Sequence, residues 1–216
     1  MSFGTSTGGS MVPTTGFPFP AVTSGSFTIV KTGVYEAHLV GGGAGGASSP
    51  ASTIAAIGGG GGAVVFAKKL YKTGDVINYI VGAAGLGAFS NVQAIFDAVS
   101  RNGGQTIFDQ YAANGGIGRI GGAITDNTDT NILNIGLSGG WAYQKNTGQS
   151  IGNLVGELFD STKTTLNPEG GASVYGKSGA AFGANATGYG AGGAKGSSTV
   201  PGGNGAQGCI WLFGPL

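Results

Sequence analysis

Charged residues are scarce in this sequence, and their scarcity excludes the partners that depend on charge. They make up 9% of the 216 residues, against about a quarter in an average soluble domain. The net charge is only +1, and the two arginines, Arg101 and Arg119, are too few to follow a phosphate backbone. We therefore expect no nucleic-acid partner.

Cysteine and histidine occur once each, which removes most thiol and metal chemistry. Cys209 has no second cysteine to pair with, and its place in the apolar run CIWLF predicts a buried, inert thiol. His38 alone cannot form the usual zinc cluster. It lies in VYEAHLV, where apolar and polar residues alternate as in a half-buried strand, so we expect a satisfied or exposed strand residue rather than a catalytic base. We expect no cofactor.

Long hydrophobic runs are also missing. No apolar run reaches the roughly 18 residues of a membrane-spanning helix. The N-terminal stretch MSFGTSTGGSMVPTTG has neither the basic nor the apolar region of a secretion signal. We therefore expect no membrane insertion and no signal peptide, with synthesis in the cytoplasm.

Glycine, by contrast, is abundant, with 48 residues. A flexible linker is the usual interpretation, but the runs GGGAGGA (41–47), GGGGGA (58–63) and GGIGRIGGA (115–123) lie directly against strand-like stretches. Such runs can pack side by side as polyproline-II-like helices because no Cβ separates them. Hydrogen bonds between neighbours then replace the internal bonds that this conformation lacks. The glycines do not recur strictly at every third residue, which excludes collagen.

Short stretches rich in β-branched and aromatic residues predict strands between the glycine runs. They are SFTIV (26–30), VYEAHLV (34–40), AVVFAKKL (63–70), DVINYIV (75–81) and the C-terminal CIWLFGPL. The turn signal YKTGD predicts that 63–70 and 75–81 form a hairpin. Only NVQAIFDAVSR (91–101) permits a helix. The predicted fold class is mainly β with little or no helix, in which short antiparallel strands and packed polyglycine-II helices form a glycine-rich sandwich.

Two parts of the chain differ in composition. Residues 1–25 are rich in Ser, Thr, Gly and Pro, with apolar points at Phe17 and Phe19, and predict an extended attachment arm without a core of its own. Residues 26–216 then form one glycine-rich β and polyglycine-II domain with loop insertions. On this interpretation, deletion of Met1 to Ser24 leaves the domain folded.

Three stretches together resemble a known family. They are GSFTIVKTGVYEAHLVGGGAGGA, GGGGGAVVFAKKLYKTGDVINYIVGAAG and the closing GGNGAQGCIWLF. They resemble the glycine-rich domains of bacteriophage tail proteins, most closely over residues 25–85 and 202–213. In the adhesins at the tips of long tail fibres of T-even-like phages, polyglycine-II helices form a packed sandwich whose loops contact the bacterial receptor.

The resemblance implies a virion protein, made in the host cytoplasm and placed in a tail fibre or tail tip. Its implied partners are a bacterial surface receptor, either an outer-membrane protein or a glycan, and other tail or fibre proteins. The sequence departs from those adhesins at its N-terminus, where only about 25 residues stand in place of a separate attachment domain. This departure gives a self-assembling short fibre or tip at least equal weight as the mode of mounting, and fibres of this kind are usually homotrimers.

One stretch fits a phosphate-binding loop by pattern alone. GASVYGKS (171–178) matches G-x-x-x-x-G-K-[ST], the loop of nucleotide hydrolases. Such a loop needs a buried strand before it and a helix after it, whereas here the flanking stretches are DSTKTTLNPEGG and GAAFGANATGYGAGG. In so glycine-rich a chain the two required glycines arise easily by chance, and we interpret the stretch as a loop.

Other chemistry has weak support. DNTDTN (126–131) offers clustered oxygen atoms for Ca²⁺ but lacks the glycine and distal glutamate of a calcium loop, and a solvated turn is the simpler interpretation. Scattered acidic residues leave glycoside cleavage open. They are Asp109, Asp126, Asp129, Glu157 and Asp160. We expect no enzyme and no metal site.

Recognition residues are expected on loops held by a rigid scaffold, where aromatic side chains supply much contact area at small entropic cost. The receptor-binding candidates are Trp141, Tyr143, Tyr175, Lys177, Phe182 and Tyr189. Aromatic side chains also cover glycine-rich scaffolds, so about half of the aromatic ones are expected in packing.

Three functional classes follow. The first is a receptor-binding adhesin of a virion. The second is a purely structural virion component, such as a fibre tip, tail cap or capsid decoration protein, because the same scaffold would serve both. An enzyme and a glycine-rich ice-binding protein form the third.

Overall fold

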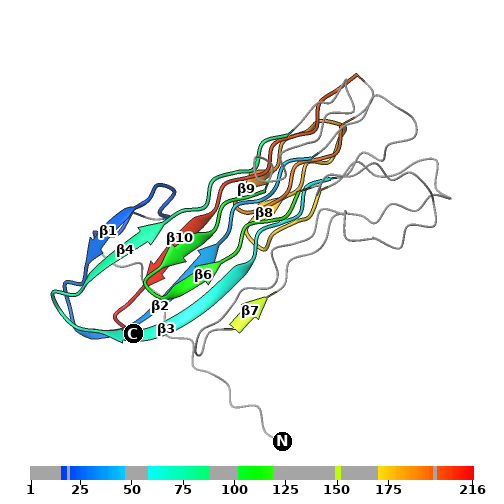
Figure 1. The fold of residues 1–216 in the computed structure, drawn as a ribbon. Coiled ribbons are helices and arrows are strands. Elements are labelled where there is room, and N and C mark those ends of the chain that lie inside the picture. Colours follow the sequence, from blue (N-terminus) through cyan, green and yellow to red (C-terminus); the bar gives the residue numbers. More distant parts are fainter. Residues whose placement is uncertain are drawn as a thin grey trace, which may run out of the picture.

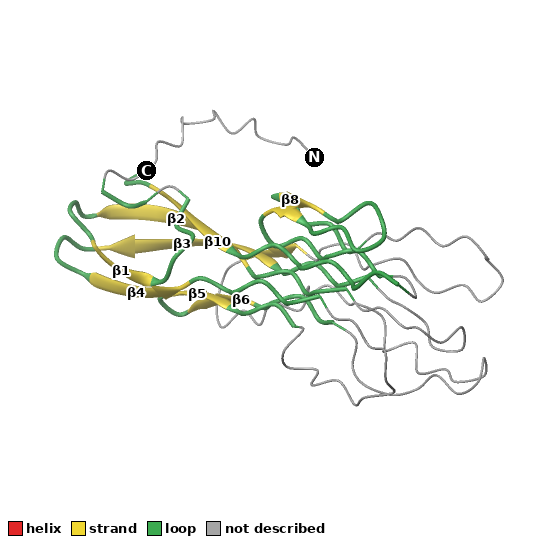
Figure 2. Cartoon of the chain, turned by 90° about the horizontal axis from the view of Figure 1, so that it is seen from above, coloured by secondary structure: helices red, strands yellow, loops and turns green. Residues whose placement is uncertain are grey.

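The computed structural model describes residues 16–18, 20–46, 58–87, 102–118, 149–151, 170–196 and 199–216. This part contains strands and no α-helix, which confirms the prediction of a mainly β fold. The predicted helix at 91–101 lies outside the described residues. Strands gather at one end of the elongated molecule, and glycine-rich segments extend from them (Figures 1 and 2).

The strands form two four-stranded antiparallel sheets and one small hairpin. The first sheet has the order β1 (Gly25–Thr28), β4 (Val76–Ile80), β5 (Thr106–Phe108) and β6 (Tyr111–Ala113). The second has the order β10 (Cys209–Phe213), β2 (Gly33–Val40), β3 (Val64–Tyr71) and β7 (Gln149–Ile151). The hairpin consists of β8 (Gly176–Lys177) and β9 (Thr187–Gly188).

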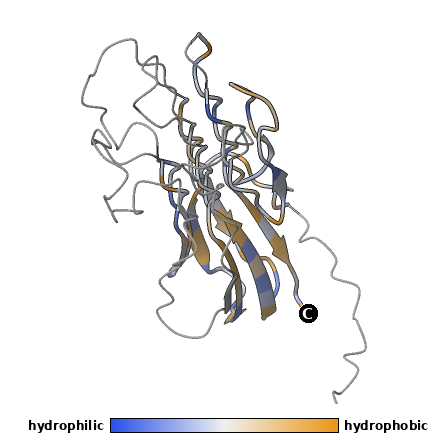
Figure 3. Ribbon diagram, turned by 90° about the vertical axis from the view of Figure 1, so that its right-hand side faces the viewer, coloured by the Kyte–Doolittle hydropathy of each residue, from blue (hydrophilic) through white to orange (hydrophobic). Residues whose placement is uncertain are grey.

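The core lies between the two larger sheets. Every second residue of a strand faces it, because side chains alternate between the two faces of a sheet. On β2, Tyr35, Ala37 and Leu39 are buried in the core, as the sequence pattern predicts. Figure 3 shows the hydrophobic colour concentrated on the strands, with the glycine-rich segments pale. The other members of the core include Ile29, Val65, Tyr71, Ile77, Tyr79, Phe108, Tyr111, Ile210 and Leu212.

The predicted hairpin between 63–70 and 75–81 is wrong. β3 pairs with β2, whereas β4 pairs with β1 and β5 in the opposite sheet. The turn between them crosses from one sheet to the other, and its Gly74 has a φ of 92° and donates its N–H to the Ile29 carbonyl at 2.8 Å. A local turn signal predicts the reversal of the chain but not the partner of each strand.

Part of the predicted N-terminal arm packs into this core. Phe17 is 6% exposed and its ring lies 5.3 Å from the rings of both Phe27 and Tyr79. Ala21 is fully buried and exchanges two backbone hydrogen bonds with Ile210 of β10, at 2.9 and 3.0 Å. The two larger sheets form a β-sandwich, called the sandwich below. The described part of the arm belongs to it, because two of its apolar side chains fill space between the sheets.

Glycine-rich segments continue from the strands as a hydrogen-bonded array around one central segment, residues 41–46. Successive N–H groups of this segment donate to different neighbours: Gly41 to Ala63, Gly42 to Gly104 and Gly43 to Ala206. The cycle then repeats, since Ala44 donates to Gly60 of the first neighbour and Gly46 to Gly203 of the third. A repeat of three residues is that of a polyproline-II-like helix without internal hydrogen bonds.

The central segment also accepts hydrogen bonds from three further neighbours. Gly116 donates its N–H to the Gly42 carbonyl, Gly85 to the Gly43 carbonyl and Gly193 to the Ala44 carbonyl. The neighbours are hydrogen-bonded to one another as well and close a ring. The order around this ring is 58–63, 114–118, 102–105, 81–87, 202–208 and 190–196, and the arrangement is the hexagonal packing expected of polyglycine II.

Close approach of the backbones explains the glycines. A Cβ on Gly43 would overlap the carbonyl oxygen of Ala191, and one on Gly42 would overlap that of Ala83. Alanine is accepted where a methyl group finds room, as at Ala44, which is fully buried. The array thus depends on which positions of each segment lack a side chain.

Candidate functional site

The outer face of the second sheet carries an aromatic cluster. Because β2, β3 and β10 alternate, the residues beside the core positions stand on the opposite face, where Val40, Val64 and Cys209 form a small buried cluster. Around it stand three aromatic residues and one histidine. They are Phe66, Trp211, Phe213 and His38, with the His38 ring 4.4 Å from Phe66 and 5.0 Å from Phe213, centroid to centroid.

The β8–β9 hairpin lies over this cluster through Tyr175. The Tyr175 hydroxyl is 2.8 Å from His38 Nδ1, across a separation of 137 residues in sequence. Its ring stacks on Trp211 with centroids 6.4 Å apart and an interplanar angle of 24°. Tyr189 packs against the same small cluster and donates its backbone N–H to the Tyr175 carbonyl at 3.0 Å. Tyr175 and Tyr189 therefore anchor the hairpin to the sandwich.

A chain of polar contacts joins Tyr175 to Glu36. The Glu36 carboxylate accepts hydrogen bonds from His38 Nε2 and from Lys68 Nζ, each at 2.8 Å. His38 Nε2 donates to Glu36, and His38 Nδ1 is hydrogen-bonded to the Tyr175 hydroxyl. Burial raises the pKa of Tyr175, and the nearby Cys209 and Glu36 add to this effect, so its hydroxyl stays protonated. These polar contacts orient the β8–β9 hairpin and provide no activated nucleophile.

The Glu36 contacts predict a pH-dependent loss of stability. Burial alone would raise the pKa of Glu36, but the hydrogen bonds from Lys68 and His38 outweigh it and leave the pKa below its usual value. A carboxyl group with a lowered folded-state pKa stabilises the fold above its unfolded pKa, and this contribution is lost as the pH falls through the folded value. Acid should therefore destabilise the wild type more than Glu36→Gln. At neutral pH that variant should cost about 1 kcal/mol.

Chemical denaturation at a series of pH values between neutral and strongly acidic tests this expectation. The difference in free energy of unfolding between the wild type and Glu36→Gln should shrink on acidification below the usual range of a glutamate. A difference that is constant with pH would show that the Glu36 charge contributes nothing to the fold.

Cys209 is buried beneath the aromatic cluster, as its sequence context predicts. Burial raises the pKa of its thiol to about 12, although a hydrogen bond involving Trp211 opposes this shift. A thiol with so high a pKa is almost entirely protonated at neutral pH and is a poor nucleophile.

The structure describes four of the six predicted recognition residues and separates Phe182 from the other three. Tyr175, Lys177 and Tyr189 lie together on the β8–β9 hairpin, where Lys177 is exposed and the two tyrosines are half-buried. Phe182 is 52% exposed and lies with Lys195, whose Nζ is 5.6 Å from its ring centroid. Trp141 and Tyr143 lie outside the described residues. One loop in the sequence thus supplies two separate surfaces.

An open depression lies on the β8–β9 hairpin. Its lining consists of Ser173, Val174, Tyr175, Gly176, Lys177, Thr187 and Gly188. Ser173 and Thr187 each bring a hydroxyl group to this place, Lys177 brings an ammonium group, and Tyr175 brings an aromatic ring whose hydroxyl is bonded to His38. These groups suit a polar ligand better than an apolar one.

The GASVYGKS stretch does not form a phosphate-binding loop. Ser173 and Gly176 exchange two backbone hydrogen bonds at 3.2 Å, and Tyr175 N–H donates to Ser173 Oγ at 3.2 Å. Gly171 N–H donates to the Gly59 carbonyl at 2.7 Å. These amides are already satisfied within the protein, and residues 179–196 that follow contain no helix whose N-terminus could face a phosphate.

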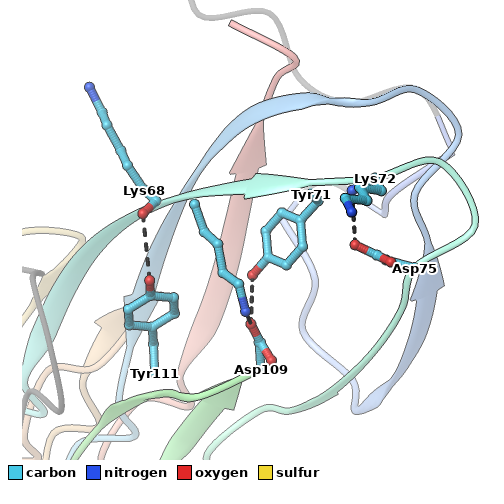
Figure 4. Close-up of polar contacts among 7 residues, drawn as sticks. Lys68, Tyr71, Lys72, Asp75, Asp109 and Tyr111 are labelled. Carbon is cyan, nitrogen blue, oxygen red and sulfur yellow. Dashed lines mark hydrogen bonds and ion pairs between the residues drawn. The ribbon is translucent and has the colours of Figure 1, made fainter.

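A second polar cluster joins the two sheets at the side of the sandwich (Figure 4). Asp109 Oδ2 accepts hydrogen bonds from Lys69 Nζ at 2.6 Å and from the Tyr71 hydroxyl at 3.0 Å. Asp109 has a φ of 56° in the turn between β5 and β6. Burial, followed by the Asp109 charge, raises the pKa of Tyr71, so its hydroxyl also stays protonated. The cluster ties β3 to the opposite sheet and has no reactive group.

The described residues contain neither a metal-ligand cluster nor a membrane-spanning helix. Among them, no three His, Cys, Asp or Glu side chains gather as metal ligands. The same part of the chain holds no helix long and apolar enough to cross a membrane. DNTDTN (126–131) and four of the acidic residues considered for glycoside cleavage lie outside it. These four are Asp126, Asp129, Glu157 and Asp160.

Sequence reasoning missed the aromatic cluster as a site feature. Trp211 and Phe213 were assigned only to a buried strand, although their alternation with Ile210 and Leu212 places them on the outer face. The period-two pattern in CIWLF could have indicated this. The contact between His38 and Tyr175 has no signal in the sequence, because 137 residues separate them.

Comparison with known families gives one match that covers the described fold. A family model described as a glycine-rich domain matches residues 22–213. A comparison with curated proteins found no match. The matched range begins within the predicted N-terminal arm and ends at Phe213, the last residue of β10, so it spans both sheets and the array.

Proposed function

We propose that this chain, which belongs to the glycine-rich domain family, is a bacteriophage tail-fibre or tail-tip protein that binds the bacterial cell surface. The observation that carries the proposal is the hexagonal array. Its segments are hydrogen-bonded to several neighbours at once, which makes a rigid support from backbone alone. Binding residues concentrate on loops held by such supports.

The array has one end attached to the sandwich and one far end. Segment 41–46 directly follows β2, and segment 58–63 directly precedes β3, so their other ends lie away from the strands. Gly46 donates to the Gly203 carbonyl at 2.8 Å there, and Gly87 N–H donates to Asn204 Oδ1 at 2.8 Å. The described ends of segments 41–46, 81–87 and 202–208 therefore lie together at the far end.

The receptor under this proposal is an outer-membrane protein or a glycan. Tyr175, Lys177, Phe182 and Tyr189, together with Trp141 and Tyr143, remain the proposed contacts. Lys177 and Phe182 suit a test best because both are exposed, whereas Tyr175 also holds the hairpin in place. The protein is then part of the virion, assembled with other tail or fibre proteins and as a homotrimer.

Fluorescently labelled protein added to a panel of bacterial strains tests the proposal. We expect saturable binding to at least one strain, weakened about tenfold or more in a variant with Trp141→Ala, Lys177→Ala and Phe182→Ala. A variant with Lys31→Ala, at an exposed position on the sandwich, should bind like the wild type. Lack of binding to every strain, by protein shown to be folded, would rule the adhesin out.

A structural role in the virion is the second candidate, and one observation favours it. Apolar side chains are exposed at the end of the sandwich away from the array, where Val34 and Leu70 are cross-strand neighbours. Val30, Leu70 and Val76 are each more than half exposed. Such a patch suits burial against another protein. The patch would serve attachment whether the protein is an adhesin or a purely structural component. A protein that is incorporated into the virion but binds no bacterial cells would be purely structural.

A further inference from the structure

Exposure along two of the glycine-rich segments, 81–87 and 202–208, follows a period of three residues. In segment 202–208 and the residue before it, Pro201, Asn204 and Gln207 are exposed while the residues between them are buried. In the neighbouring segment, Ala83 and Leu86 are exposed at the same spacing. A polyproline-II-like helix has three residues per turn, so each set lies in a line on one side of its helix.

These lines belong to adjacent helices in one flat row. Segment 202–208 is hydrogen-bonded to 81–87 within the ring, through Gly205 N–H and the Gly85 carbonyl at 2.9 Å. On its other side lies a short segment, 184–186, outside the ring. Ala186 N–H donates to the Asn204 carbonyl, and the Ala184 carbonyl accepts from Ala194 N–H of segment 190–196.

Hexagonal packing fixes where segment 184–186 lies. In such a lattice, consider a helix that packs from outside against two neighbouring helices of the ring. It lies in line with one of these two and with that helix's other neighbour in the ring. Segments 184–186, 202–208 and 81–87 therefore share one flat surface. We call it the amide face and define it by its exposed residues, Ala83, Leu86, Asn185, Asn204 and Gln207.

Two asparagines on the amide face are held in fixed orientations. Asn204 Oδ1 accepts from Gly87 N–H, and Asn185 Oδ1 accepts from Asn204 N–H, each at 2.8 Å. Both carboxamide oxygens are thus bound to backbone, while the side chains are exposed. Each amide still carries an NH₂ group with two donor hydrogens, whose direction the bonded oxygen sets. Fixed donors lose little entropy when a ligand binds.

The chemistry of this face selects among ligands. Its outward side chains have replaced glycine at every third position, so a further glycine-rich helix from a second copy cannot pack against it as the helices within the array do. None of its five residues is ionisable, which gives no charge to attract an ionic ligand. Leu86, 61% exposed, adds an apolar surface beside the amides.

We propose that the amide face binds a neutral polysaccharide chain of the bacterial surface. The carboxamide NH₂ groups of Asn185 and Asn204 donate to hydroxyl, ring or acetamido oxygens of the sugar residues. Leu86 and Ala83 contact the C–H faces of those residues, and Gln207 extends the row of polar contacts. This inference rests on the proposed function and adds a ligand surface on the side of the array to the contacts proposed on the loops.

Asn185→Asp combined with Asn204→Asp tests the proposal without emptying the face. Aspartate keeps an oxygen to accept the backbone N–H and removes the donor NH₂ group, so the fold should be preserved. Asn78→Asp, at an exposed position of β4, controls for the effect of one added negative charge away from the amide face. Circular dichroism and thermal unfolding establish that all three proteins are folded.

Binding is measured on immobilised dextran, mannan, galactan and chitin oligosaccharides, and on the bacterial panel before and after periodate or protease treatment. We expect the wild type to bind at least one neutral polysaccharide, or cells in a periodate-sensitive manner. The double variant should lose about tenfold or more in affinity. The Asn78→Asp variant should bind like the wild type.

The outcomes separate this proposal from the function on which it rests. Cell binding that survives both periodate and the double substitution would keep the adhesin and overturn the amide face. Binding that only protease abolishes would likewise point to a protein receptor and overturn it. Binding to a polysaccharide without binding to any strain would support the face and count against the adhesin. Binding to neither would overturn both.

Discussion

Gly43→Ala should destabilise the protein by roughly 3–5 kcal/mol or prevent it from folding, because the new methyl group overlaps buried backbone. The Cβ would meet the Ala191 carbonyl oxygen, which is part of a neighbouring helix and cannot rotate away. Gly43 N–H donates to the Ala206 carbonyl at 2.7 Å, and its own carbonyl accepts from Gly85 N–H at 2.8 Å. Moving the segment to relieve the overlap would break both bonds.

The adjacent position supplies the control. Ala44→Gly removes a buried methyl group without adding one, and should cost about 1–2 kcal/mol from lost burial and greater chain entropy. Differential scanning calorimetry of the two variants and the wild type measures the difference. Equal stability of Gly43→Ala and Ala44→Gly would mean that the helices do not pack as closely as described.

Phe17→Ala should cost roughly 3–5 kcal/mol, because Phe17 is a core residue although it lies in a stretch that looks like a linker. Its ring meets Phe27 edge-on at 89° with centroids 5.3 Å apart, and lies 6.3 Å from Phe108. Truncation would leave a cavity between the two sheets. Removal of residues 1–24 should be at least as damaging, since it also removes the Ala21 contacts with β10.

Urea denaturation measures this effect, with Val22→Ala as the control. Val22 is 36% exposed and close in sequence, so its truncation should cost well under the Phe17 value. If the protein without residues 1–24 is as stable as the wild type, Phe17 and Ala21 belong to an attachment arm, as the sequence alone suggested.

Local features of the sequence predicted the fold class and much of the strand content. The alternation in VYEAHLV is enough to assign Tyr35, Ala37 and Leu39 to the core, because side chains alternate along any strand. The apolar surroundings of Cys209 likewise predict its burial. The abundance of glycine next to strands predicted packed helices without internal hydrogen bonds. Each of these depends only on residues near in sequence.

The candidate sites could be predicted only in part. The exposure of Lys177 and Phe182 agrees with their glycine-rich, polar surroundings. That Tyr175 is instead bound to His38, and that Asn185 and Asn204 lie on adjacent helices, could not be predicted. The residues of each pair come from different segments, and no spacing within the sequence relates them.

The amino-acid sequence was enough to predict the strands at 26–30, 34–40, 63–70, 75–81 and the C-terminus, the core-facing residues of 34–40, and that glycine runs must find their hydrogen-bond partners outside themselves. The partners of these elements could be read only from the folded chain: β3 and β4 lie in different sheets, Phe17 enters the core, and residues 41–46 form the centre of the array. Backbone conformation and side-chain alternation are local properties. A polyglycine-II helix, in contrast, makes all its hydrogen bonds to other segments, and every glycine run offers the same N–H and C=O groups.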